Sequence, residues 1–337
     1  MRAFGKHGAG KHYWIEGSPP LVIAEFGVSH MGDAEELMRA MLAYQCADIY
    51  KFQLHSPSEM VPLHRHKKLI HQCMLTDGEL RQCFQLARDL GKLAACTAFS
   101  PDDAEALADW YDRGILDIIK VGSGEADNVV MRDIYTSRKR RIIVSRGMSD
   151  YNYWAEAAGD NVAFMHCVSE YPTQKHDLIK MSTMAREMPT VAIGYSDHSE
   201  SSDSSAAVVA SAMGAAFLER HVTVSKSSPD IKVEDNPLQF ILYWENVRRA
   251  WRDLRGEKYS DRGEDTRGWA LHYLVAKNHI RPGDSLSGNV TTARVDGNEY
   301  DVENYLSASS NPVIYQATEP IIKGSLILKG QVNDVRF

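Results

Sequence analysis

Hydrophobic and polar positions follow a repeating order along the first two-thirds of the chain, in which a short apolar run precedes a longer amphipathic segment. This order is typical of parallel strands joined by crossover helices. Eight runs are predicted to be strands: residues 21–27, 49–54, 93–99, 118–123, 142–146, 162–168, 191–195 and 216–221. The segments between them predict helices at residues 34–44, 77–90, 101–110, 128–136, 202–213 and 238–254.

Eight strand and helix repeats predict an α/β fold, a closed (β/α)8 TIM barrel. An open doubly wound sheet is the alternative, but the sequence lacks the Gly-rich phosphate turn of the GxGxxG type that such a sheet usually carries. Active sites of TIM barrels lie at the carboxyl ends of the strands. Polar residues that end the predicted strands are therefore the candidates for chemistry.

The composition changes after the eighth repeat. Residues 257–268 are charged and contain no large aliphatic residue, so they are predicted to link a barrel domain at 1–256 to a second domain at 269–337. The second domain has short β-like runs at 273–276, 312–316 and 325–328, separated by turn dipeptides such as Pro-Gly and Lys-Gly. We expect a small, mostly β module that docks on another surface, because it is near the lower size limit for independent stability.

Composition narrows the class of protein. The 337 residues are 44% hydrophobic and 25% charged, which is typical of a globular protein. No apolar run approaches the roughly 18 residues of a membrane span, and residues 1–10 lack the apolar core of a secretory signal, so we expect a cytoplasmic protein. The net charge of −7 argues against a nucleic-acid partner. Five widely spaced cysteines without a C-x-x-C pair argue against a disulfide framework or a zinc knuckle.

Nearly every predicted strand ends in groups suited to chemistry. These are Glu25 and His30, Lys51 and Gln53, Thr97, Lys120 with Ser123 and Glu125, Ser145 with Arg146, Ser169 with Tyr171, Ser196 with Asp197 and His198, and Glu219 with His221. A strand end buried for packing alone would not need lysines and carboxylates. We therefore expect these sets to converge on one pocket.

The two lysines at strand ends have two interpretations. With nearby hydroxyls, Lys51 and Lys120 could bind a phosphate or carboxylate through fixed positive charge. Alternatively, one lysine could form a Schiff base with a carbonyl substrate. The hydroxyl-rich surroundings favour anion binding; the hydroxyls are those of Thr97, Ser123, Ser145 and Ser196.

His198 and His221 end neighbouring predicted strands, so their rings could meet at one divalent ion. Imidazole is a common ligand of Mn, Fe, Co and Zn, and an ion with open positions could polarise a carbonyl. Hydrogen-bonded core histidines are the alternative. Asp197 is interpreted as a group that orients a ligand or caps the following helix.

The insertion at 55–76 contains His64, His66 and His71 in eight residues, and it is predicted to be a solvated loop.

Glu25 and Glu125 would face the same pocket. Carboxylates there can hold sugar hydroxyls or move protons, and their alternative role is an ion pair with Lys51 or Lys120. Together these residues predict a pocket for an anionic small molecule, a metal-polarised carbonyl and a polyol.

Eight motifs in fixed order give the chain a family resemblance. They are AEFGVSHMG at 24–32, KFQ at 51–53, TAFS at 97–100, KVGSGE at 120–125, SRGM at 145–148, HCVSEYP at 166–172, GYSDH at 194–198 and ERHVT at 219–223. In this order the sequence resembles the sialic acid synthase family, whose members condense phosphoenolpyruvate with an N-acetylhexosamine. The second domain resembles the type III antifreeze-like module that these enzymes carry.

The resemblance implies roles for individual residues. Phosphoenolpyruvate would contact Lys51, Thr97, Lys120, Ser123, Ser145, Ser169 and Ser196. The open-chain amino-sugar aldehyde would contact Glu25, Gln53, Glu125, Tyr171, Asp230 and, from the partner's module in a homodimer, Arg294. His198 and His221 would hold Mn or Mg. Glu25, Lys51, Lys120 and Glu125 are implied to be catalytic, with Glu125 the proton-transfer group, and the product would be a nine-carbon 2-keto sugar acid.

The chain departs from the family pattern at a few positions. Ser29 stands where Asn is usual, Met31 follows His30 within the opening motif, Arg146 replaces Thr in the S-T-G-M segment, and Glu234 opens the segment that often reads S-x-x-P. Arg146 is expected either to add a bidentate contact to an anion or to close the pocket to an N-acetyl group.

Two other functions stay open: a lysine Schiff-base aldolase on the same barrel, and a non-catalytic protein that binds sugar acids.

Overall fold

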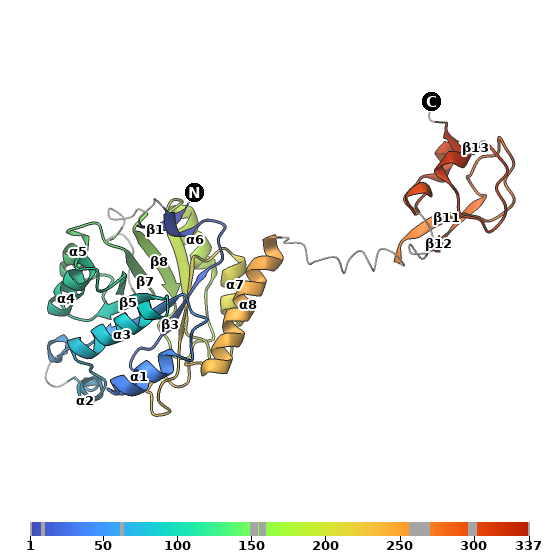
Figure 1. Ribbon diagram of the computed structural model, residues 1–337. Coiled ribbons are helices and arrows are strands. Elements are labelled where there is room, and N and C mark those ends of the chain that lie inside the picture. The colour runs from blue at the N-terminus through green and yellow to red at the C-terminus, as the bar shows by residue number, and fades with distance from the viewer. Residues whose placement is uncertain are drawn as a thin grey trace. The chain divides into compact units, whose positions relative to one another are not determined.

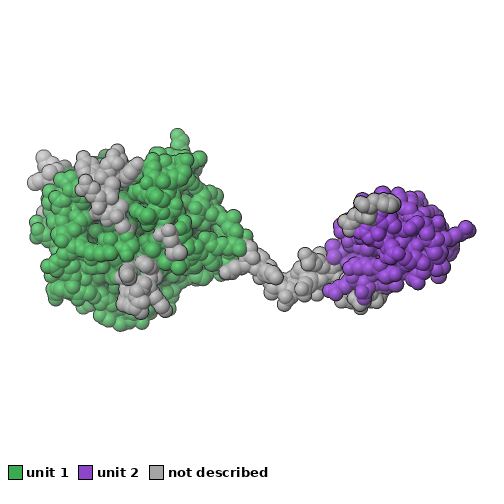
Figure 2. All heavy atoms as spheres, turned by 90° about the horizontal axis from the view of Figure 1, so that it is seen from above, with its two compact units in different colours: residues 1–256 green, residues 257–337 purple. Residues whose placement is uncertain are grey.

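The computed structural model describes residues 2–7, 11–60, 64–148, 154, 160–255, 270–295 and 302–335. It contains two compact units, Met1–Gly256 and Glu257–Phe337 (Figure 2). The linker predicted at 257–268 lies outside the described residues. Within the described ranges, no helix is long and apolar enough to cross a membrane.

The first unit is built around a closed barrel of eight parallel strands (Figure 1). The strands are β3 (Leu21–Glu25), β4 (Ile49–Leu54), β5 (Leu93–Ala98), β6 (Ile118–Val121), β7 (Ile142–Arg146), β8 (Val162–Cys167), β9 (Ala192–Asp197) and β10 (Phe217–His221). β10 pairs with both β3 and β9, which closes the sheet. The predicted (β/α)8 barrel is confirmed.

Six helices lie where the amphipathic pattern predicts them. They are α1 (Ala34–Met41), α3 (Asp77–Asp89), α4 (Pro101–Asp112), α5 (Val129–Thr136), α7 (Ser205–Ala212) and α8 (Pro237–Arg255). Local capping explains where two of them begin. Thr76 and Glu79 form a capping box before α3, and Ser100 caps α4, whose first residue is Pro101.

The sequence did not predict α2 (Lys67–Gln72) or α6 (Ile179–Glu187). The 3₁₀ turn η1 (Pro57–Glu59) and α2 both lie in the insertion at 55–76, so the prediction of a plain loop there is wrong for the backbone. Three histidines of this insertion, His64, His66 and His71, are exposed as expected, whereas His55 at its start is buried.

An unpredicted hairpin closes the floor of the barrel, the end at which the strands begin. Its strands β1 (Ala3–His7) and β2 (Lys11–Ile15) pair antiparallel. Phe4 and Trp14 are buried against the first inward residues of the barrel strands, among them Ile23 and Phe217. The rings of Phe4 and Phe217 meet edge to face at 5.0 Å. The opposite end is left for chemistry.

The second unit is a small β-rich body with its own core. β11 (His272–Ala276) pairs with β12 (Val290–Arg294), and β13 (Tyr315–Ala317) pairs with β14 (Val332–Asp334). The turns η3 (Val302–Asn304), η4 (Pro312–Ile314) and η5 (Lys329–Gln331) connect them. The β-like run expected at 312–316 begins as a 3₁₀ turn, because the Asn311 side chain caps it. The run at 325–328 forms isolated bridges instead of a strand. The core contains Leu274, Ile280, Leu286, Leu306 and Ile327.

Candidate active site

Strand alternation places the polar residues in one cavity at the carboxyl end of the barrel. On β4, Tyr50 and Phe52 pack outward against the helices, whereas Lys51 and Gln53 point inward. The cavity has a volume of about 370 Å³, which suits a small molecule. The predicted site residues that line it are Lys51, Gln53, Thr97, Lys120, Ser123, Glu125, Ser145, Ser169, Tyr171, Ser196, His198 and His221.

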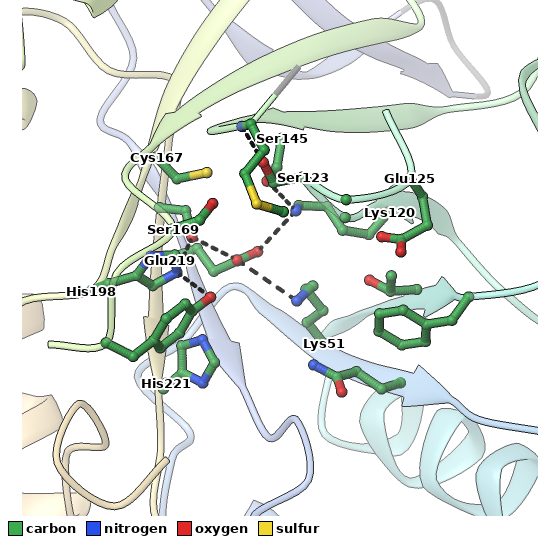
Figure 3. Close-up of a pocket in the computed structure, with 18 residues that line it drawn as sticks. Lys51, Lys120, Ser123, Glu125, Ser145, Cys167, Ser169, His198, Glu219 and His221 are labelled. Carbon is green, nitrogen blue, oxygen red and sulfur yellow. Dashed lines mark hydrogen bonds and ion pairs between the residues drawn. The ribbon is translucent and has the colours of Figure 1, made fainter. Parts of the chain in front are cut away.

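A buried network of charges occupies the base of this cavity (Figure 3). Glu219 lies 3.7 Å from the Nζ atoms of both Lys51 and Lys120, and Lys51 also contacts Glu25 at 2.6 Å. Burial opposes ionisation of Glu219, but the two ammonium groups hold its pKa well below its usual range. Burial also acts to lower the pKa of Lys51, yet Glu219 and Glu25 raise it, whereas burial dominates at Lys120 and lowers its pKa. The two lysines therefore differ electrostatically.

Hydroxyl groups and a glycine form a cradle beside Lys120. Ser123 Oγ accepts the backbone N–H groups of Gly147 and Met148, each at 2.8 Å, and its hydroxyl also lies in hydrogen-bond reach of the Cys167 thiol, so its proton points into the cavity wall where an anion could accept it. A Cβ atom at Gly147 would lie 2.5 Å from Ser169 Oγ, so the space beside Ser169 stays empty only if residue 147 is a glycine. Thr97 Oγ1 is buried and has no hydrogen-bond partner among the described residues. Lys120 donates to Ser145 Oγ at 2.6 Å. This arrangement suits an anionic group.

His198 and His221 lie together on the other wall, with ring centroids 5.5 Å apart. The Nδ1 of His198 donates to the Val168 carbonyl at 2.7 Å, so Nε2 carries the lone pair and accepts from the Tyr171 hydroxyl at 3.0 Å. Burial, and then His221, lower the pKa of His198 to about 3, so its imidazole is neutral. Asp230 lies 3.7 Å from His221 Nδ1. Within the described ranges, no group of three His, Cys, Asp or Glu side chains is arranged to hold a metal.

The carboxylates expected on the sugar side occupy different environments. Glu25 is fully buried and pairs with Lys51, the alternative role considered for it, and it accepts from Gln53 Nε2 at 2.7 Å. Glu125 lines the cavity, and burial raises its pKa above its usual value. Its carboxylate lies where a Cβ atom of Gly122 would be, so this glycine gives it room. Glu125 is therefore the better placed of the two to exchange a proton with a ligand.

The loop between β10 and α8, which carries Asp230, is organised around the buried carboxyl group of Glu234. The hydroxyls of Ser29 and Ser228 both donate to it, Ser29 at 3.0 Å. Ser29 Oγ accepts the Val224 N–H at 2.8 Å, and Ser228 Oγ accepts the Asp230 N–H at 3.2 Å. Burial raises the pKa of Glu234 to about 7. Two of the departures from the family pattern, Ser29 and Glu234, are therefore partners.

Two strand-end residues point away from the cavity. Arg146 lines a separate cavity with His166 and Lys180, so both predicted roles for it in the anion or sugar pocket are wrong. Asp197 ion-pairs with Arg220 at 3.7 Å and accepts from the Ser199 backbone, so it does not orient a metal ligand. The reason is the same in both cases: each follows an inward residue and therefore faces outward.

The sequence analysis placed Glu219 among the strand-end residues expected at the pocket but gave it no role, although it is the centre of the charge network. Its position two residues before His221 was the available signal, because both must share the inward face of β10. Phe99, Met148 and Cys167 also line the cavity without having been predicted. Arg294 ends β12 in the second unit, and its role stays a prediction.

A closed parallel barrel whose carboxyl end gathers ionised groups, hydroxyls and two imidazoles defines a TIM-barrel protein with an enzyme-like site for a small anionic molecule. The model of the NeuB family matches residues 39–259, and the chain therefore belongs to the NeuB family. The resemblance to sialic acid synthases drawn from the motifs is confirmed.

Curated relatives agree with this assignment. The chain is 28% identical over 305 residues to N,N'-diacetyllegionaminic acid synthase of Campylobacter jejuni, covering 81% of this chain and 90% of that protein. It is 30% identical over 237 residues to human N-acetylneuraminate-9-phosphate synthase, covering 64% of this chain and 65% of that protein. The chain is thus similar to synthases of sialic acid type.

Solved structures share the fold. N-acetylneuraminic acid synthetase of Leptospira borgpetersenii, in complex with citrate, superposes with a TM-score of 0.65 at 21% identity, over 79% of this chain and 95% of that one. Spore coat polysaccharide biosynthesis protein SpsE of Bacillus subtilis gives a TM-score of 0.62 at 21% identity, over 98% and 99% of the two chains.

Proposed function

We propose that this chain condenses phosphoenolpyruvate with an aldehydo amino sugar and water, giving a nine-carbon 2-keto sugar acid and phosphate. C3 of phosphoenolpyruvate attacks the aldehyde carbon, water adds at C2, and the C2–O bond breaks to release phosphate. The observation that carries the proposal is a single cavity with an anion cradle on one side and a pair of imidazoles on the other. Membership of the NeuB family supports it.

Phosphoenolpyruvate would occupy the cradle beside Lys120. Ser123 and Ser169 donate their hydroxyl protons to its oxygen atoms, and Gly147 leaves the space that the group fills. Thr97 Oγ1, which lacks a partner among the described side chains and backbone groups, gains one in the complex. Lys51 and Lys120 supply positive charge, while Ser145 and Ser196 hold Lys120 and Glu219 in place.

His198 and His221 would hold a divalent ion, Mn or Mg, through ring nitrogens. The fit is good at His198, because its Nδ1–H donates to a backbone carbonyl and leaves Nε2 as a ligand. When bound, the ion supplies a Lewis acid for the aldehyde oxygen. Tyr171, whose hydroxyl now donates to Nε2, would turn instead to a sugar hydroxyl.

Glu125 is proposed to protonate the aldehyde oxygen as the C–C bond forms, because it lines the cavity and burial raises its pKa, which favours the protonated form. Gln53 and Asp230 would hold the hydroxyl groups of the open-chain sugar, and Glu25 would hold Gln53 and Lys51 beneath it. We propose that the protein is a homodimer in which Arg294 of the antifreeze-like module reaches the sugar site of the partner.

Phosphate release from phosphoenolpyruvate tests the proposal, with Mn²⁺ and a panel of aldehydo amino sugars that includes N-acetylmannosamine. Release that requires both an acceptor and a metal is the expected result. In ¹⁸O-labelled water the phosphate should stay unlabelled, because the C–O bond breaks. One labelled oxygen in the phosphate would refute the proposed cleavage.

A lysine Schiff-base aldolase is the second candidate, and the lowered pKa of Lys120 favours it. Borohydride reduction with substrate separates the two mechanisms. A trapped adduct on Lys51 or Lys120 would support the aldolase, whereas the condensing mechanism predicts none. Absence of phosphate release with every acceptor, together with binding of a sugar acid, would support a non-catalytic binding protein.

A further inference from the structure

A line of hydrogen bonds leads from the insertion at 55–76 to the charge network of the cavity. Glu25 Oε1 accepts from Gln53 Nε2 at 2.7 Å, and Gln53 Oε1 lies 2.9 Å from His55 Nε2. His55 Nδ1 lies 3.0 Å from both carboxylate oxygens of Glu59. The line thus joins two residues of the insertion, His55 and Glu59, to Gln53 on the inward face of β4.

The partners along this line determine which atoms donate. Glu25 pairs with Lys51 at 2.6 Å and accepts from Gln53, so Gln53 directs its amide nitrogen there and its carbonyl oxygen toward His55. His55 Nε2 is then the donor to Gln53 Oε1, and His55 Nδ1 faces both oxygens of the Glu59 carboxyl group. The reverse orientation of the Gln53 amide would place its carbonyl oxygen against the Glu25 carboxylate. His55 and Glu59 together therefore select one orientation of the Gln53 amide.

The histidine and its partner are held rigidly. His55 is 6% exposed, and its ring stacks on Phe99 at 4.5 Å with 4° between the planes. Glu59 Oε2 also accepts the Ser56 backbone N–H at 3.2 Å, which ties it to the start of η1. Fixed partners of this kind orient a neighbouring group without the entropy loss that a mobile side chain would incur.

We propose that His55 and Glu59 are positioning residues for the acceptor sugar: they fix the Gln53 amide so that its remaining N–H is directed to a hydroxyl oxygen of a polyol substrate. This inference rests on the proposed function, because it assigns the control of acceptor binding at that same site. Neither residue lines the cavity, so they act through Gln53. The phosphoenolpyruvate cradle beside Lys120 lies outside this line.

The test compares H55F, E59Q and the control H64F by steady-state kinetics with phosphoenolpyruvate and the best acceptor. H55F keeps an aromatic ring to stack on Phe99 and removes both ring nitrogens, whereas His64 is an exposed histidine of the same insertion. We expect the KM for the acceptor to rise about threefold to tenfold in H55F, the loss associated with one misdirected hydrogen bond. The KM for phosphoenolpyruvate should stay within about twofold, and H64F should match the wild type.

Several outcomes would overturn the inference. An unchanged acceptor KM in both H55F and E59Q would do so, and so would an equal rise of both KM values, which indicates a general loss of structure. If H55F does not fold, E59Q keeps the size of the side chain and carries the same prediction at a smaller magnitude. Wild-type protein without turnover on any acceptor would instead overturn the proposed function and this inference with it.

Discussion

The two ends of the barrel are built from the same strands and contain opposite chemistry. At the floor, the inward residues Ile23 and Phe217 pack in an apolar layer closed by Phe4 of the hairpin. Two residues further along the same strands, the inward side chains are Glu25 and Glu219. Because the side chains of a strand alternate with period two, one strand can stabilise the fold at its start and present charge at its end.

The two ends of the barrel also differ in how much they contribute to the free energy of folding. Burial of a phenylalanine contributes about 1.5–3 kcal/mol of apolar transfer free energy. Buried ion pairs contribute little, because the cost of desolvation offsets their attraction. The free energy of unfolding should therefore depend mainly on the floor, and turnover on the carboxyl end of the barrel, which we call the mouth. Substitutions at each end should separate the two properties.

Replacing a mouth histidine should give the largest change in activity. In His198→Ala or His221→Ala we expect kcat/KM to fall about a thousandfold or more, because one of two proposed metal ligands is lost. The free energy of unfolding should change by no more than about 1 kcal/mol. Phosphate release and urea denaturation measure the two quantities, and His71→Ala, an exposed histidine in α2, is the control. Full activity of either variant in the presence of a chelator would contradict the metal role.

Replacing a floor residue should have the opposite profile. Phe217→Ala should lower the free energy of unfolding by about 3–5 kcal/mol, because it leaves a cavity beneath Phe4. Turnover at low temperature, measured where the variant is still folded, should remain close to that of the wild type. A variant that loses turnover while fully folded would show that the floor and the mouth are not independent.

Filling the anion cradle should have a smaller and selective effect. In Gly147→Ala the new Cβ would meet Ser169 Oγ at 2.5 Å, so we expect the KM for phosphoenolpyruvate to rise about tenfold or more. Gly124→Ala is the control, because Gly124 lines the cavity and its Cβ would make only an ordinary contact with Met148 at 3.5 Å. Similar kinetics for the two variants would place the anion elsewhere.

The smallest effect should be the pH dependence caused by Glu234. Burial raises its pKa in the folded state to about 7, above the value of 4.5 expected when it is exposed. Between these values the unfolded chain releases the proton and the folded chain keeps it, so the stability contributed by this group is lost as pH rises from about 4.5 to 7. Urea denaturation of wild type and Glu234→Gln across this range should differ in slope, because the Gln side chain has no proton to release. Parallel curves would mean that Glu234 does not titrate there.

The predictable part of the fold was its strand repeat. Short apolar runs and amphipathic segments located all eight barrel strands and six helices, since these patterns reflect the burial of each element. The pairing of β1 with β2 was missed, because Phe4 and Trp14 are buried by strands that lie far along the chain. In the site, Glu219 was undervalued and Arg146 was placed in the wrong cavity, since alternation along each strand was not applied to single positions.

The amino-acid sequence by itself determined which strands form, which end of each is polar, and the family to which the chain belongs, because these depend on local patterns and motif order. Only the tertiary structure decided which polar groups meet. These are Glu219 with both lysines, Ser29 with Glu234 across 205 positions, and His55 with Gln53 and Glu59. Pairings of this kind depend on strand register and loop path. Each is set by the packing of residues far apart in the chain, which no local pattern encodes.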